Sequence, residues 1–122
     1  MKIKVGINGM GRIGRMILRA IFENNNKKIE IKHINNRTDL KNAIQLLKYD
    51  SVHGKFNADI KFNEKYLFIN NKKISYSRET ELNNINWKKN NVDIVLECTG
   101  KYNSREKSFQ HIKNGAKKVI VS

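Results

Sequence analysis

Residues 5–15 hold three glycines at the spacing G-x-G-x-x-G, namely Gly9, Gly11 and Gly14, directly after an apolar run. Glycine adopts backbone angles that other residues avoid and leaves the main chain uncovered. When such a turn opens a helix it can hold an anion, because the first helical N–H groups lack partners and the helix dipole is positive there. A plain tight turn seldom needs three glycines at this spacing, so the pattern favours a phosphate site.

Each glycine of this turn has a separate expected role. Gly9 allows the sharp turn out of the strand, Gly11 lets a pyrophosphate approach the backbone, and Gly14 lets the helix pack closely on the strand. The spacing alone is a weak signal. It gains weight because a strand precedes it, a helix follows it, and a second strand completes a crossover unit of about 35 residues.

Strands and helices alternate around this turn. Alternating apolar residues predict a strand over 2–8, and helical spacing predicts a helix from Arg12 to about Phe22. After a polar break, a second strand is expected over 29–35. The apolar residues expected on one face of the helix are Ile13, Met16, Ile17, Ala20 and Ile21.

The rest of the chain continues the alternation. Thr38 or Asp39 can cap a second helix, residues 48–56 are expected to be irregular, and residues 57–77 read as short antiparallel strands turning at Asn70-Asn71. The buried stripe expected for the second helix is Leu40, Ala43, Ile44 and Leu47.

The C-terminal third is expected to hold a strand over 92–97, a helix and a closing strand over 119–121. Asn103 or Ser104 would cap this helix, which carries Phe109 and Ile112 and stops at Gly115. The whole pattern predicts a single α/β domain over 1–122, with an open, mostly parallel sheet, helices on both faces and a short antiparallel insertion.

A second cofactor signal is expected at the end of the strand over 29–35. A site for NAD usually places an acidic residue there to accept hydrogen bonds from the ribose hydroxyls. This chain has Asn35, Asn36 and Arg37 instead. Asn36 can bond a hydroxyl without repelling a 2′-phosphate, and Arg37 could pair with that phosphate. We therefore expect NADP to bind comparably to NAD or better; the alternative is that both residues are ordinary surface groups.

Composition narrows the functional classes. The net charge is +14 over 122 residues, but the lysines are scattered, and the joint abundance of Lys, Asn and Ile is typical of an AT-rich genome. We therefore expect no specific nucleic-acid partner, although a stand-alone nucleotide- or RNA-binding module stays open as an alternative. No apolar run could span a bilayer and the N-terminus lacks a signal-peptide pattern. A cytoplasmic protein without a membrane partner is expected.

The remaining reactive side chains favour structural roles. Cys98 is the single cysteine, which excludes an internal disulfide, and after an apolar strand it reads as a small filler rather than a nucleophile. His53 reads as structural, and neither His33 nor His111 belongs to a metal-ligand pattern. No catalytic residue and no metal ligand is predicted.

Four motifs in order resemble the phosphorylating glyceraldehyde-3-phosphate dehydrogenase family. They are VGINGMGRIGR at 5–15, LKYDSVHGKF at 47–56, ECTG at 97–100 and GAKKVIVS at 115–122. The erythrose-4-phosphate dehydrogenase family is a close second, because CTGKYNSRE at 98–106 is similar to its pattern; the segment DSVHG at 50–54 favours the first family. The resemblance covers the entire chain and implies a Rossmann-type, doubly wound domain that binds NAD or NADP.

The resemblance also implies roles for particular residues. It puts Asn8, Gly9, Gly11, Arg12 and Ile13 along the phosphates and adenosine, and Asn35 and Asn36 at the adenine ribose, with Asn36 replacing the family's usual Asp. Arg78 would border the adenine through its backbone, Thr99 and Gly100 would run beneath the cofactor, and Ser122 would end the strand that leads to the nicotinamide. Met10 and Cys98 depart from the family's usual Phe and Ser, and both changes look tolerable.

The family's reaction needs a nucleophilic cysteine and a histidine base. The resemblance puts both, together with the catalytic domain, beyond Ser122. We therefore expect these 122 residues to be an N-terminal fragment without dehydrogenase activity. The parent enzyme would be a homotetramer, and the fragment a monomer or weak oligomer.

Overall fold

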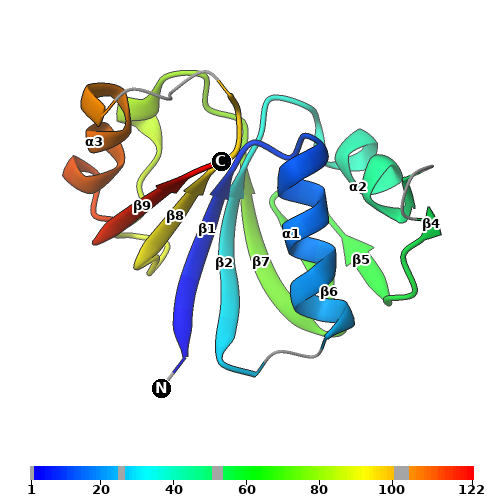
Figure 1. Cartoon of the computed structure of the whole chain (residues 1–122). Coiled ribbons are helices and arrows are strands. Elements are labelled where there is room, and N and C mark those ends of the chain that lie inside the picture. The colour runs from blue at the N-terminus through cyan, green and yellow to red at the C-terminus, as the bar shows by residue number, and fades with distance from the viewer. Residues whose placement is uncertain (1, 25–26, 51–53, 101–104) are drawn as a thin grey trace.

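The structure is a computed structural model that describes residues 2–24, 27–50, 54–100 and 105–122 (Figure 1). Helices, short strand pairs and one 3-10 turn surround a central sheet. In chain order the elements are β1 (Ile3–Asn8), α1 (Arg12–Glu23), β2 (Ile29–Asn35), α2 (Leu40–Lys48), β3 (Tyr49–Asp50), β4 (Gly54–Lys55), β5 (Ile60–Phe62), β6 (Tyr66–Ile69), β7 (Lys72–Ser77), η1 (Leu82–Asn84), β8 (Ile94–Glu97), α3 (Arg105–Lys113) and β9 (Lys118–Val121).

The seven-stranded sheet has the order β5-β6-β7-β2-β1-β8-β9. The five strands from β7 to β9 run parallel, and β5 and β6 continue the sheet antiparallel to β7. Winding leads from β1 outward through β2 to β7, and then restarts on the other side of β1 with β8. This is a doubly wound sheet whose strand order reverses between β1 and β8, as a Rossmann-type fold requires. The predicted fold class is confirmed.

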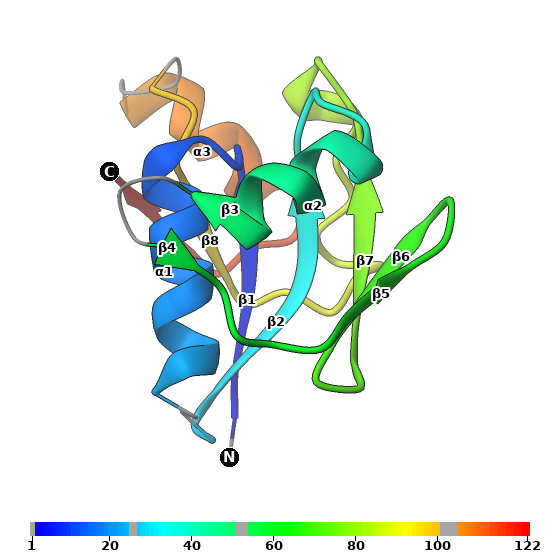
Figure 2. The same cartoon turned by 90° about the vertical axis from the view of Figure 1, so that its right-hand side faces the viewer.

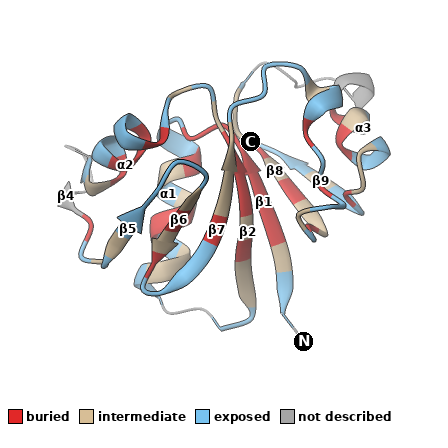
Figure 3. Ribbon diagram, turned by 180° about the vertical axis from the view of Figure 1, so that it is seen from behind, coloured by how far each residue is buried: buried red, intermediate tan, exposed pale blue. Residues whose placement is uncertain are grey.

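The two faces of the sheet bury different clusters, because successive side chains of a strand point to opposite faces. On β1, Val5 and Ile7 pack into the main core with Leu18 of α1. Gly6 lies under Trp87, whose ring would be 2.5 Å from a Cβ at that position. Trp87 leads the second cluster, with Ile85, Val92, Val95 and Ala116. Figure 3 shows the buried residues concentrated in the middle strands.

The pairing of β1 with β2 contains a bulge. Val5 pairs with Ile31 but Gly6 pairs with His33, so Lys32 is an extra residue in β2. Across the bulge Ile31 and Ile34 reach the main core, whereas His33 packs edge-on against the Trp87 ring at 5.5 Å between centroids. The bulge thereby changes which residues of β2 face each cluster.

Helix α1 forms where predicted, but the prediction of its buried face was wrong. The side chains in the interface are Gly14, Leu18 and Arg19, while Ile13 and Met16 are 40% and 39% exposed. The reason is the turn before the helix: Gly14 must contact the Gly9 carbonyl, and this rotates the face that follows Gly14 toward the sheet. The apolar stripe lies about one residue to the side, with Ile17 and Ile21 at its edge.

Helix α2 and the hairpin agree with the sequence. Asp39 caps α2 by accepting a hydrogen bond from the Asn42 N–H at 2.8 Å, and all four residues of the expected stripe are buried. Asn70 and Asn71 have φ angles of 50° and 67°, in the left-handed region that an Asn-Asn turn requires. Figure 2 shows α2 and the β5–β6 hairpin at the side of the sheet away from α3.

Two further predictions need correction or fall outside the described residues. Residues 48–56 are not wholly irregular, since β3 and β4 form a two-stranded antiparallel pair. In α3 the buried side chains include Ser108 and His111, whereas Phe109 and Ile112 are exposed. The predicted caps of α3, Asn103 and Ser104, lie outside the described residues, as does His53.

Candidate functional site

A cavity of about 190 Å³ opens at the carboxyl ends of β1, β2 and β8. This is the point where the strand order reverses, which is where open α/β sheets bind ligands. Its volume is below the roughly 300–1,000 Å³ of a pocket that encloses a whole ligand, so it would enclose one part of an extended molecule. Its lining residues are Asn8, Gly9, Gly11, Asn35, Asn36, Arg37, Glu79, Thr80, Leu82, Cys98 and Thr99.

The three glycines of the turn differ in what surrounds them. Gly9 has a φ of +97°, and a Cβ there would lie 2.8 Å from Thr99 Cγ2. A Cβ at Gly14 would clash with the Gly9 carbonyl oxygen. A Cβ at Gly11 would meet nothing within 4 Å. Gly9 and Gly14 are therefore required by the fold, whereas the space beside Gly11 is open to a ligand.

The amino end of α1 suits an anion. Gly11 is the N-cap and offers no side-chain cap, and the first turn of Arg12, Ile13 and Gly14 includes no carboxylate. Those first N–H groups lie before the first bond of the helix, which Arg15 donates to the Gly11 carbonyl at 3.0 Å. By contrast, α2 satisfies its own amino end through Asp39. The free amides and the dipole make the start of α1 the better place for a phosphate.

The ends of β1 and β2 fix this turn from one side. The Gly9 N–H donates to the Asn35 carbonyl at 2.8 Å, and the Met10 N–H donates to Asn36 Oδ1 at 3.1 Å. Because the amide oxygen of Asn36 is engaged by Met10, its NH₂ group is the part left to face a ligand. Asn36 therefore offers hydrogen-bond donors where an aspartate would offer only acceptors.

Two cations and one carboxylate lie around the outer part of the cavity. Arg37 lines it, and the Arg37 carbonyl accepts a hydrogen bond from Arg78 Nε at 2.9 Å. Glu79 also lines it, and its backbone is held by Asn35, which accepts from the Glu79 N–H at 2.9 Å and donates to the Glu79 carbonyl at 3.0 Å. Arg78 is exposed and does not line the cavity, although it anchors the loop that carries Arg37.

A buried network of polar side chains runs beneath the site. Asn35 donates to Asn8 Oδ1 at 2.9 Å, and Asn8 donates to Glu97 Oε1 at 2.7 Å. Asn8 and Glu97 are the last residues of the paired strands β1 and β8. Glu97 Oε2 accepts from both the N–H and the hydroxyl of Thr99, at 3.0 and 2.6 Å. The network therefore joins both walls of the cavity.

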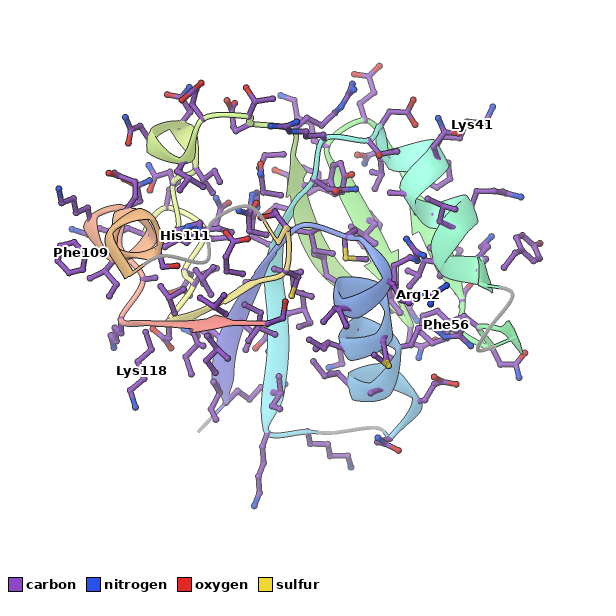
Figure 4. All side chains as sticks on the ribbon, turned by 45° about the horizontal axis from the view of Figure 1, so that its top comes forward. Arg12, Lys41, Phe56, Phe109, His111 and Lys118 are labelled. Atoms are coloured by element: carbon purple, nitrogen blue, oxygen red, sulfur yellow. The ribbon has the colours of Figure 1, made fainter. Side chains whose placement is uncertain are left out.

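Helix α3 completes this network from the far side, where Figure 4 labels His111. His111 Nδ1 accepts from the Trp87 indole N–H at 2.9 Å, so the ring proton sits on Nε2 and is donated to Glu97 Oε1 at 2.7 Å. Burial favours the protonated carboxyl of Glu97, but the hydrogen bonds from His111, Thr99 and Asn8 more than offset this and lower its pKa. Glu97 is thus a fully buried carboxylate held in its charged form.

Cys98 and Ser122 lie at the edges of the site. The Cys98 N–H donates to the Asn8 carbonyl at 2.8 Å, and burial, together with the nearby Glu97 charge, raises the pKa of its thiol. A protonated thiol is a poor nucleophile, which agrees with the filler role expected for Cys98. Ser122 bonds the Glu97 carbonyl through its N–H at 3.0 Å and is exposed outside the cavity.

The cavity thus gathers seven of the predicted site residues: Asn8, Gly9, Gly11, Asn35, Asn36, Arg37 and Thr99. The other six, Arg12, Ile13, Gly14, Arg78, Gly100 and Ser122, do not line it. Arg12 and Ile13 follow Gly11 directly in the first turn of α1, Gly14 is buried beneath Gly9, and Gly100 is exposed with a φ of +75°. Sequence reasoning missed Glu79, Thr80 and Leu82, which reach the site because β7 pairs in parallel with β2.

His33 predicts a pH dependence of stability. Its ring nitrogens lie 2.6 Å from Ser75 Oγ and 2.8 Å from Ser77 Oγ, and burial lowers its pKa from 6.5 to about 4. Between these values the unfolded chain binds a proton that the native fold excludes. Stability is therefore full above pH 6.5 and falls towards pH 4, by about 3 kcal/mol, since one pKa unit is worth about 1.4 kcal/mol.

Urea denaturation across this pH range measures the effect, and His33→Gln provides the control because Gln does not titrate. The variant should lose the part of the pH dependence that belongs to His33. Parallel stability curves for the two proteins would contradict the assignment.

Metal and membrane roles find no support in the described residues. Across 2–24, 27–50, 54–100 and 105–122 no group of three His, Cys, Asp or Glu side chains could hold a metal ion. In that same part of the chain no helix has the length and apolar character needed to cross a bilayer. The described site is therefore built from amides, hydroxyls and arginines, which are groups that recognise phosphates and ribose.

Comparison with known proteins agrees with this geometry. A family model described as "Glyceraldehyde 3-phosphate dehydrogenase, NAD binding domain" matches residues 3–105. A glyceraldehyde-3-phosphate dehydrogenase from Geobacillus stearothermophilus is 45% identical over 122 residues, which is 100% of this chain and 36% of the relative. One from Thermotoga maritima is 44% identical over 119 residues, covering 98% and 36% of the two chains. The chain spans about 36% of the length of these relatives.

Proposed function

Because this chain belongs to the glyceraldehyde-3-phosphate dehydrogenase family, and matches its NAD-binding domain, we propose that the turn from Gly9 to Gly14 binds the diphosphate of a nicotinamide dinucleotide. A dinucleotide cofactor follows from the family. The observation that supports the location is the open space at Gly11, beside an α1 amino end with no side-chain cap.

The rest of the cofactor would extend along the cavity from that turn. We propose that Arg12 and Ile13 contribute their backbone amides to the diphosphate, and that Asn35, Asn36 and Arg37 lie at the adenosine ribose. The NH₂ group of Asn36, the exposed guanidinium of Arg37 and the nearby Glu79 support this end of the assignment. Arg78 would border the adenine, while Thr99, Gly100 and Ser122 would follow the strand ends toward the nicotinamide.

The protein that contains this domain is proposed to oxidise and phosphorylate an aldehyde, with hydride transfer to the nicotinamide. This proposal rests on the names of the relatives and on the family resemblance, because the chain covers 36% of their length. The described residues supply the binding part of the reaction: they hold and orient the cofactor. Exposed apolar side chains, including Ile13, Met16 and Ile120, support association with other protein surface in a larger assembly. A homotetrameric parent enzyme in the cytoplasm remains part of the proposal.

NAD and NADP are expected to bind with comparable affinity, or with NADP preferred. Asn36 carries no charge that would repel a 2′-phosphate, and Arg37 can pair with it. Asn36→Asp should weaken NADP binding by about tenfold or more while NAD affinity stays equal or improves, because a carboxylate keeps the acceptor that Met10 uses but repels the phosphate. Calorimetric titration of both cofactors into both proteins measures this.

The wild-type protein also tests the parent proposal, since NAD should bind saturably and raise the melting temperature. A wild-type preference for NAD of about a hundredfold would contradict the NADP proposal and leave dinucleotide binding intact. Failure of both cofactors to bind would contradict the binding proposal itself.

A further inference from the structure

We propose that Glu97 is a positioning residue for the dinucleotide, holding the Gly9 turn and the Thr99 loop in the arrangement that receives the diphosphate. The inference rests on the proposed function. Glu97 is 1% exposed and lies beneath the cavity without lining it, so its effect on a ligand must pass through the residues that it bonds.

The first link runs from Glu97 to Thr99. One carboxylate oxygen accepts both the N–H and the hydroxyl of Thr99, which fixes the backbone and the side chain of that residue together. Thr99 in turn lies against the Gly9 turn, because its N and Cγ2 atoms would be 3.0 and 2.8 Å from a Cβ at Gly9. A displaced Thr99 would therefore enter the space beside the turn.

The second link runs from Glu97 to Asn8. The other carboxylate oxygen accepts the Asn8 amide, and Asn8 accepts the Asn35 amide. The Asn35 carbonyl receives the Gly9 N–H, so this path reaches the same turn from the opposite wall. One buried charge thus fixes both sides of the candidate diphosphate site.

His111 gives the carboxylate its orientation from helix α3. Trp87 donates to His111 Nδ1, which leaves Nε2–H to donate to Glu97 Oε1. All four hydrogen bonds at Glu97 therefore come from donors. A glutamine at 97 would turn its NH₂ group toward donors on one side or the other, and it cannot satisfy both sets.

The charge itself works against an anionic ligand, and this makes the test decisive. Removing a negative charge near a diphosphate should strengthen its binding by simple Coulomb attraction, whereas loss of positioning should weaken it. Glu97→Gln is expected to weaken ADP and NAD by about tenfold or more, the size of a lost hydrogen-bond set to a charged group, and to leave adenosine within about twofold. Glu23→Gln is the matched control, since it removes the same charge from an exposed position on α1.

Binding is measured by calorimetry for ADP and NAD and by NMR for adenosine, at a temperature where circular dichroism shows each variant folded. Equal or tighter ADP binding by Glu97→Gln would overturn the inference, as would proportional losses for ADP and adenosine. If that variant does not fold, His111 in the wild-type protein gives the answer: its imidazole signals should shift with ADP and not with adenosine, and unchanged signals at ADP saturation would overturn the inference. A wild-type chain that binds neither ADP nor NAD removes the proposed function, and this inference with it.

Discussion

Replacing Gly11 with valine is expected to abolish dinucleotide binding and leave the fold intact. The backbone of Gly11 has φ −71° and ψ −163°, which any residue can adopt, and a Cβ there would meet no protein atom within 4 Å. The added methyl groups would instead fill the space proposed for the diphosphate. We expect NAD affinity to fall by about a hundredfold or more, measured by calorimetry, with the urea midpoint unchanged within about 0.5 kcal/mol.

Gly9→Ala provides the contrast. Its positive φ and the nearness of Thr99 predict a loss of stability of about 2 kcal/mol in addition to the loss of binding. Gly11→Ala should fall between wild type and Gly11→Val in affinity. If Gly11→Val binds NAD as tightly as the wild type, the diphosphate does not lie at this turn.

The largest effect on stability is expected for Trp87→Ala. Trp87 is fully buried, and it donates a hydrogen bond to His111 while its ring packs edge-on against both His33 and His111. Truncation of a buried Trp leaves a large cavity and typically costs about 3–5 kcal/mol. The free energy of unfolding should fall by that amount in urea titrations followed by circular dichroism, a large share of the roughly 5–15 kcal/mol of a typical domain.

A double-mutant cycle with Gly6 checks that the Trp87 ring is the cause. A Cβ at Gly6 would lie 2.5 Å from one ring carbon of Trp87 and 3.0 Å from Val92 Cγ1. Gly6→Ala alone should therefore destabilise by about 1–3 kcal/mol through overpacking. In the Trp87→Ala background the same change should cost about 1 kcal/mol less or better. Additive effects would mean that the ring does not occupy the space above Gly6.

Local patterns were sufficient to predict the elements and the order of the site. The glycine turn, the Asp39 cap and the Asn70-Asn71 hairpin each depend on residues close in sequence, and the structure has all three. The doubly wound sheet follows from the alternation of strand and helix. These features could be predicted because their causes are backbone preferences and short-range hydrogen bonds.

Tertiary contacts account for the features that sequence reasoning missed. The buried face of α1 was predicted from its apolar stripe, but Gly14 must meet the Gly9 carbonyl, and that contact rotates the helix. Glu79 lines the cavity because β7 lies beside β2, a pairing that no local pattern encodes. Glu97 and His111 carry no motif of their own, and their roles follow from two strand ends and a helix meeting at one buried point.

The bulge in β2 limits how this strand can change in evolution. Without the extra Lys32, the residues Ile31, His33 and Asn35 would share one face, since side chains alternate. An insertion or deletion of one residue in this strand would therefore turn Asn35 and His33 away from their partners and expose Ile34 to the polar side. Length variation among descendants of this gene should accordingly occur in the loops flanking β2 and spare the strand itself.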